Sequence, residues 1–280
     1  FTYWCHDFLF NYDQFRISMT DIDSMKFKVQ SFTPDVMGRR PLRYVRTTLQ
    51  NFNGELYIDK PNNKSSRRVY HDYPIFTSGK KNYIYYDRRD IYDRVYPRET
   101  FFVEVHQFTI DSLDNTTAEG LSFDGTFVSA GIFPEMEQTL KVQRDYSLGF
   151  RIATPPEGLS AYGGAGQFTD SLSLDESGLV GGGSIRYLSS LSQGKAITFF
   201  PDSATGLTEV FDLTAETGTA YHPPVRGIGS FLRWLPNEDR LEQSSRENPF
   251  EMYDDVDMLG TGTLALTPAA LEGRGQIDFL

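Results

Sequence analysis

Aromatic and basic side chains concentrate between residues 70 and 102, where they could bind a ligand or a partner. Aromatic faces stack on sugars and anchor protein interfaces, and neighbouring cations attract anionic groups. The alternative is that the rings pack on a sheet while Lys and Arg line its rim, and the pattern favours this structural interpretation. The binding surface predicted from this segment comprises Tyr83, Tyr85, Tyr86, Arg88, Arg89, Tyr92, Arg94 and Tyr96.

The residue types that usually carry catalysis occur without the spacing that catalysis needs. The histidines have no partner at the spacing of a metal site; they are His6, His71, His106 and His222. No Gly-x-Ser-x-Gly nucleophile motif is present, and the glycines at 181–183 lack the Lys-Ser/Thr pair of a phosphate-binding loop. The sequence therefore predicts no catalytic residue, no metal ligand and no cofactor, and it favours a non-enzymatic protein.

Carboxylates gather near the C-terminal end of the chain, at Glu251, Asp254, Asp255 and Asp257. Oxygen ligands of this kind bind calcium, but the spacing of a calcium-binding loop with its distant Glu is missing. We interpret the cluster as a solvated acidic turn. The paired carboxylates of a glycoside hydrolase must face each other across about 5–10 Å. Because a sequence does not show such a distance, a glycan-active enzyme or a glycan-binding module stays an alternative.

Alternation of apolar and polar residues is the dominant structural signal. Apolar residues of one parity run from Leu140 to Ile152, which predicts a strand with one buried face. The alternation from Phe101 changes phase near His106, which predicts a β-bulge at 106–107. Helical periodicity is nearly absent, and the best helix candidate is short, residues 237–246 after Pro236. The sequence predicts an all-β fold with little helix.

Part of the sequence repeats at an offset of 92 residues. Residues 171–187 and 263–279 share an alternating strand, a turn and the pattern Leu-x-Gly-x-Gly-x-Ile-x-aromatic. A hairpin of this kind presents an apolar face that it cannot bury alone, so successive units must stack. The repeat predicts stacked β units, arranged as a β-solenoid or as β-sandwich-like repeats.

Composition divides the chain near residue 115. Residues 1–115 form a predicted basic, tyrosine-rich β region, and residues 116–280 form a predicted acidic, Gly/Ser-rich β-repeat region. The formal net charge of -11 argues against a nucleic-acid binder. No apolar run is long enough for a membrane-spanning helix, and Cys5 has no partner for an internal disulfide. The first residue is Phe1 and the last residues resemble the middle of a strand, so we expect a fragment of a larger chain.

Short Asp-Ser-aliphatic motifs occur at residues 23–25, 111–113, 170–172 and 202–204. They resemble the sequon that Bacteroidota use for O-glycosylation of exported proteins. That resemblance implies modification at Ser24, Ser112, Ser171 and Ser203. The alternative is that Asp-Ser pairs simply form turns.

The Leu-x-Gly-x-Gly-x-Ile units, with residues 147–150, 162–164 and 200–203, resemble large uncharacterised repeat proteins of Bacteroidota cell envelopes. More distantly they are similar to AsmA/TamB-like β-repeat proteins. The resemblance covers mainly residues 116–280, and the tyrosine-rich first part departs from it. It implies an extracytoplasmic protein of the periplasm or cell surface, whose partners are other envelope proteins or the rest of its own chain. A scaffold segment, a lipid-conducting β-groove and a glycan-binding module are the hypotheses.

Overall fold

The computed structural model describes residues 1–216, 221–253 and 255–279. Nearly all regular structure in these residues is antiparallel strand, and the helical elements are two short 3-10 turns. The prediction of an all-β fold is therefore confirmed. The chain forms two compact units, and the composition change near residue 115 lies inside the first of them. The first unit comprises residues 1–128 and 135–150, and the second comprises residues 129–134 and 151–280.

The first unit is built on antiparallel strands in the order β1–β2–β5–β7–β8–β10–β11–β12. β6 pairs with the C-terminal half of β5, and β9 pairs with β6. β3 and β4 form a separate two-stranded sheet. The bounds are β1 (Thr2–Asn11), β2 (Arg16–Lys26), β3 (Lys28–Gln30), β4 (Leu42–Tyr44), β5 (Leu49–Tyr57), β6 (Ile75–Ser78), β7 (Asn82–Tyr85), β8 (Phe101–Val105), β9 (Thr109–Ile110), β10 (Ser122–Ser129), β11 (Met136–Val142) and β12 (Leu148–Ala153).

Aromatic side chains fill the core of the first unit. Phe101 of β8 meets Phe127 of β10 edge-on, with ring centroids 5.3 Å apart. Tyr3 of β1 contacts Phe76 of β6 at 5.3 Å, although β2 and β5 lie between these strands. The sheet is therefore curled, and its inward-facing side chains pack against one another.

Three local predictions from the sequence were wrong. The strand expected over residues 140–152 is interrupted by a turn, in which Tyr146 has a φ of 66°. The phase change at 106–107 is a break between β8 and β9, which pair with different strands, and not a bulge. The expected helix at 237–246 is a single 3-10 turn followed by a strand, because Leu241 and Gln243 alternate inward.

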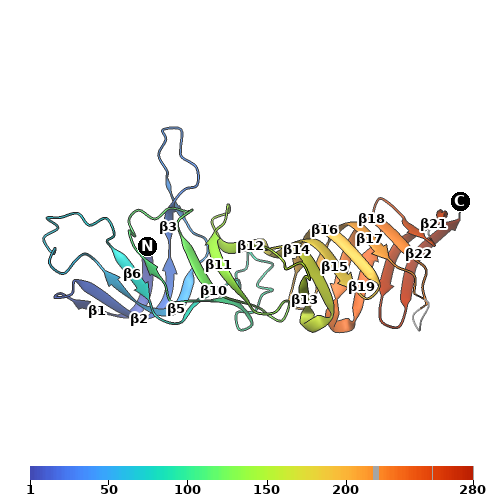
Figure 1. The fold of residues 1–280 in the computed structure, drawn as a ribbon, viewed down its shortest axis with the longest axis horizontal. Coiled ribbons are helices and arrows are strands. Elements are labelled where there is room, and N and C mark those ends of the chain that lie inside the picture. The colour runs from blue at the N-terminus through green and yellow to red at the C-terminus, as the bar shows by residue number, and fades with distance from the viewer. Residues whose placement is uncertain (217–220, 254, 280) are drawn as a thin grey trace. The chain divides into compact units, whose positions relative to one another are not determined.

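The second unit is one antiparallel meander, in which almost every strand pairs with the next in the chain (Figure 1). β19 and β20 share one position between β18 and β21. The bounds are β13 (Leu159–Ala161), η1 (Tyr162–Gly164), β14 (Gly166–Asp175), β15 (Gly178–Tyr187), β16 (Ser190–Phe199), β17 (Ala204–Leu213), β18 (Val225–Leu235), η2 (Pro236–Glu238), β19 (Arg240–Ser244), β20 (Phe250–Met252), β21 (Asp255–Leu266) and β22 (Leu271–Phe279).

This sheet buries its apolar face by curling on itself. Trp234 of β18 is fully buried and reaches Gly166 of β14, where an added Cβ would lie 2.8 Å from the indole. Gln243 of β19 donates through Nε2 to Oγ of Ser192 on β16 at 3.0 Å, across the intervening β17 and β18. The Gln243 side-chain oxygen also accepts from Ser230 at 2.8 Å, so these three buried polar side chains are paired with one another.

Tyr187 of β15 carries a buried hydroxyl with no hydrogen-bond partner among the described residues. Burial, with a smaller contribution from Asp239, raises the pKa of Tyr187 to about 12. Because its pKa is higher in the folded than in the unfolded protein, the neutral phenol favours the folded state. This contribution to the free energy of unfolding is complete below the unfolded pKa of about 10 and is lost as the pH rises toward 12.

We expect Tyr187→Phe to raise the free energy of unfolding by about 1 kcal/mol at neutral pH, because the substitution removes an unpaired buried hydroxyl. The variant should also lose less stability than the wild type between pH 8 and pH 11, as measured by urea denaturation. The exposed Tyr44 gives the control Tyr44→Phe, which should follow the wild type. An equal alkaline loss in both variants would show that Tyr187 does not contribute to it.

Candidate interaction surfaces

The predicted aromatic and basic surface divides into a buried part and an exposed part. Along β7 the burial alternates, so that Ile84 points into the core and Tyr83 and Tyr85 lie half-exposed on the opposite face. Tyr86 follows on the buried side and donates its hydroxyl to the Leu148 carbonyl at 2.9 Å. Tyr96 is also buried, and its ring stacks on Phe101 at 4.1 Å. Tyr86 and Tyr96 are therefore part of the core.

The exposed part forms what we call the aromatic platform, which is Tyr83, Tyr85 and Phe102 on β7 and β8. The rings of Tyr83 and Tyr85 are stacked with centroids 5.9 Å apart, and Phe102 meets Tyr83 edge-on at 5.8 Å. The Arg98 guanidinium lies 4.5 Å from the Tyr85 centroid. Burial, with smaller contributions from Glu104 and Tyr85, raises the pKa of the Tyr83 phenol. Such a surface offers ring faces beside a cation.

The other residues of the predicted binding surface lie in the segment that follows β7. Tyr92 and Arg94 have φ values of 47° and 67°, in a turn closed by a backbone hydrogen bond from Arg94 to the Ile91 carbonyl. Arg89 is exposed, and Arg88 donates to the Arg46 carbonyl at 2.9 Å and pairs with Asp90. The predicted set therefore does not form one surface. Phe102 and Arg98, which were outside it, complete the platform.

We expect the two kinds of tyrosine to respond differently to loss of the hydroxyl. Tyr86→Phe leaves the buried Leu148 carbonyl without its donor and should lower the free energy of unfolding by about 1–2 kcal/mol. Tyr85→Phe should leave it unchanged to within about 0.5 kcal/mol. Urea denaturation of both variants tests this, and equal losses would contradict the placement of Tyr86 in the core.

A second candidate surface lies on the repeated hairpin. The first hairpin copy is β14–β15 and the second is β21–β22, and their registers coincide at an offset of 92 residues. Leu174 pairs with Leu179 in the first, and Leu266 pairs with Leu271 in the second.

The two copies also share an unusual backbone position. Gly183 has a φ of 153° and Gly275 has a φ of 154°. An added Cβ would lie 2.0 Å from the Thr169 oxygen in the first copy and 1.8 Å from the Thr261 oxygen in the second. Only glycine fits so close an approach, so the repeat seen in the sequence is a repeat of backbone geometry.

The copies differ in what covers them. In the first, the rings of Phe168 and Phe199 pack on Gly181, with atoms 2.4 and 2.8 Å from where its Cβ would be. In the second, Gly260 stands where the first copy has Phe168, and an added Cβ on Gly273 would meet only Leu264, at 3.6 Å. The result is a groove of about 390 Å³, lined by residues that include Phe250, Met252, Leu264, Leu271, Gly273 and Ile277.

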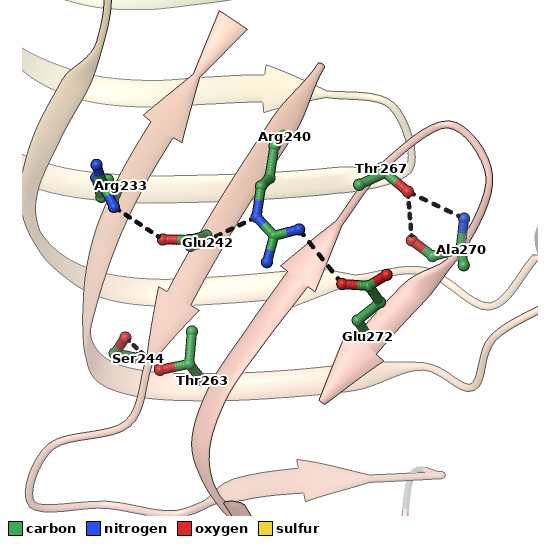
Figure 2. Close-up of polar contacts among 8 residues, drawn as sticks. All are labelled: Arg233, Arg240, Glu242, Ser244, Thr263, Thr267, Ala270 and Glu272. Carbon is green, nitrogen blue, oxygen red and sulfur yellow. Dashed lines mark hydrogen bonds and ion pairs between the residues drawn. The ribbon is translucent and has the colours of Figure 1, made fainter. Parts of the chain in front are cut away.

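The opposite face of the second hairpin copy is joined to the sheet by polar contacts (Figure 2). Arg240 of β19 contacts Glu242 at 2.8 Å and Glu272 of β22 at 3.3 Å. Ser244 and Thr263 share a hydrogen bond of 2.9 Å between β19 and β21. Glu272 and Thr263 of the polar face are therefore paired with β19, while the apolar face of the hairpin lines the groove.

The four serines of the Asp-Ser motifs lie in different surroundings. Ser171 donates its hydroxyl to the Gly182 carbonyl, and Ser112 donates to the His71 carbonyl. Ser24 lies in β2, and Ser203 lies in the turn between β16 and β17. Modification of these serines stays a prediction. Asp254 and the side chains of Asp255 and Asp257 lie outside the described residues.

Within residues 1–216, 221–253 and 255–279, no group of three or more His, Cys, Asp or Glu side chains is arranged to hold a metal ion. The same residues contain no helix with the length and apolarity to cross a membrane.

Comparison with known proteins gives no relative: no protein-family model matches the chain, and no curated protein and no solved structure matches it either.

Proposed function

We propose that this chain is a non-enzymatic structural or interaction segment of a large extracytoplasmic envelope protein. The observation that carries the proposal is the repeated hairpin, whose two copies share register and glycine geometry. Proteins built from such repeats gain stability from contacts between neighbouring units and use their extended surfaces to bind partners. The resemblance in sequence to envelope repeat proteins supports the location.

The aromatic platform is the contact surface that we assign to a protein partner. Tyr83, Tyr85 and Phe102 offer a large apolar area with few rotatable bonds, and Arg98 adds a cation at its edge. Aromatic residues and Arg are the types most enriched at protein interfaces. The curled sheet beneath the platform holds these rings in place.

A lipid-conducting groove is supported less well. It needs an apolar surface that stays open along the strands, whereas side chains fill the curled sheet between β14 and β19. Phe168, Phe199 and Trp234 are fully buried there. The open apolar groove is confined to the last strands of the sheet.

The proposal is tested by photocrosslinking in cells of the source organism. A photoreactive phenylalanine replaces Tyr85 on the platform, and in a control it replaces the exposed Lys141 of β11. We expect the probe at position 85 to give one discrete protein adduct in the envelope fraction, and the probe at 141 to give none. Absence of an adduct from both positions, together with specific binding on a glycan array, would replace the proposal with a glycan-binding function.

A further inference from the structure

We propose that the β3–β4 arm, which we define as residues 28–44, docks on an anionic lipid surface and inserts its apolar tip among the headgroups. The arm consists of β3, β4 and the loop between them, and this loop projects from the first unit (Figure 1). It is an internal segment, preceded by β2 and followed by β5. The inference goes beyond the proposed function and concerns a different surface from the aromatic platform.

The tip of the arm is held in one shape by Asp35. Its backbone N–H donates to the Arg39 carbonyl at 2.7 Å, and the Gly38 N–H donates to the Asp35 carbonyl at 2.9 Å. The Asp35 side chain accepts from the N–H groups of Met37 and Arg39, both at 2.9 Å. Gly38 has a φ of 77°, which glycine adopts without strain. A tip with a fixed backbone loses little conformational entropy when it binds.

Two adjacent apolar side chains occupy this tip. Val36 is fully exposed and Met37 is 74% exposed, although turns are ordinarily formed by Gly, Asn, Asp or Ser. A stable protein interface buries about 800 Å² on each partner, and two side chains at a convex tip offer far less. The interface of a bilayer, in contrast, takes up exposed apolar side chains without a matching pocket. The shape of the tip therefore favours a lipid surface over a protein.

The charge of the arm indicates which kind of lipid. Its one carboxylate is Asp35, against the four cations Lys28, Arg39, Arg40 and Arg43, so the arm has a balance of +3 in a chain of net charge -11. Arg39 contacts Asp35 at 3.4 Å and Arg40 contacts Glu119 at 2.9 Å. Each guanidinium has five N–H donors, so these pairs leave donors for phosphate oxygens. Basic residues beside an apolar tip are attracted to anionic headgroups.

The first test measures binding of the whole chain to vesicles by cosedimentation. Vesicles of equal parts phosphatidylcholine and phosphatidylglycerol should bind it at least about tenfold more tightly than pure phosphatidylcholine. Val36→Asp places a charge at the tip and should weaken binding to the mixed vesicles at least about tenfold, a change of about 1.4 kcal/mol. The matched control is Val69→Asp, which makes the same change at a valine that is 78% exposed in another loop. It should alter binding less than about twofold, or about 0.4 kcal/mol.

The second test detects insertion of the tip. Met37→Trp keeps the tip apolar, and its fluorescence, after subtraction of the signal of the parent chain, should be quenched by lipids brominated in their acyl chains. Val69→Trp should not be quenched. This pair separates insertion from adsorption by charge alone, because a chain that only adsorbs would leave both tryptophans unquenched.

Three results would overturn the inference. The chain does not bind the mixed vesicles; Val36→Asp and Val69→Asp weaken binding equally; or Met37→Trp stays unquenched while the chain is bound. A photoreactive residue at position 37 that crosslinks to a protein, in a chain that does not bind vesicles, would assign the arm to a protein partner instead. None of these results affects the crosslinking test at Tyr85, so the two proposals fail separately.

Discussion

Trp234→Ala is expected to lower the free energy of unfolding of the second unit by about 3–5 kcal/mol, the usual cost of truncating a large buried aromatic residue. Trp234 is fully buried, and its ring lies 5.0 Å from Tyr162 and 5.8 Å from Tyr187. It connects β14, β15 and β18, so its loss removes contacts that hold the curled sheet closed. Urea denaturation measured by circular dichroism gives the change.

The other tryptophan of the chain provides a matched control. Trp4 of β1 is 44% exposed and carries Lys26 over its ring at 5.1 Å. Trp4→Ala should cost less than about 1 kcal/mol, since only a partly exposed contact is lost. Equal losses in the two variants would contradict the closure of the second unit around Trp234.

The second large effect is expected at Gly181, where Gly181→Val should destabilise the second unit by about 3 kcal/mol. The added carbons would overlap the rings of Phe168 and Phe199, which already lie within 2.8 Å of the Cβ position. Both rings are fully buried, so neither has room to move away.

The equivalent change in the second hairpin copy is Gly273→Val, for which we expect a change within about 0.5 kcal/mol. Its Cβ has open space beyond 3.6 Å, and valine is favoured in strands. Thermal or urea denaturation of both variants tests the difference. A similar loss at Gly273 would mean that the groove is filled in the folded protein.

The sequence was sufficient to predict the fold class and the repeat, because both depend on local patterns. Alternation of apolar residues specifies strands, and the glycines of the repeat mark places where only a bare backbone fits. It did not predict that β8 and β9 are separate strands, since a change of phase looks the same for a bulge and for a break. The short helix expected at 237–246 was not found, because its single apolar residue, Leu241, is buried together with Gln243 on one face of β19.

The candidate sites were harder to predict, because they depend on which face of a strand a residue occupies. Tyr85 and Tyr86 are neighbours in the sequence, yet one lies on the platform and the other is buried. The groove was missed because it arises from a difference between the repeats. Gly260 replaces Phe168, and that substitution is visible in the aligned copies, but its consequence appears only where the first copy shows Phe168 packed on Gly181.

The most direct test of the account compares amide hydrogen exchange in the two hairpin copies of the purified chain. β15 (178–187) lies between two strands, whereas β22 (271–279) pairs only with β21 among the described strands. We predict that alternate amides of β22, those on the side away from β21, exchange at least about a hundredfold faster in this chain than their counterparts in β15, because amides without a strand partner need no unfolding to exchange. Equal protection of the two strands would contradict the pairing of β22 with β21 alone among the described strands.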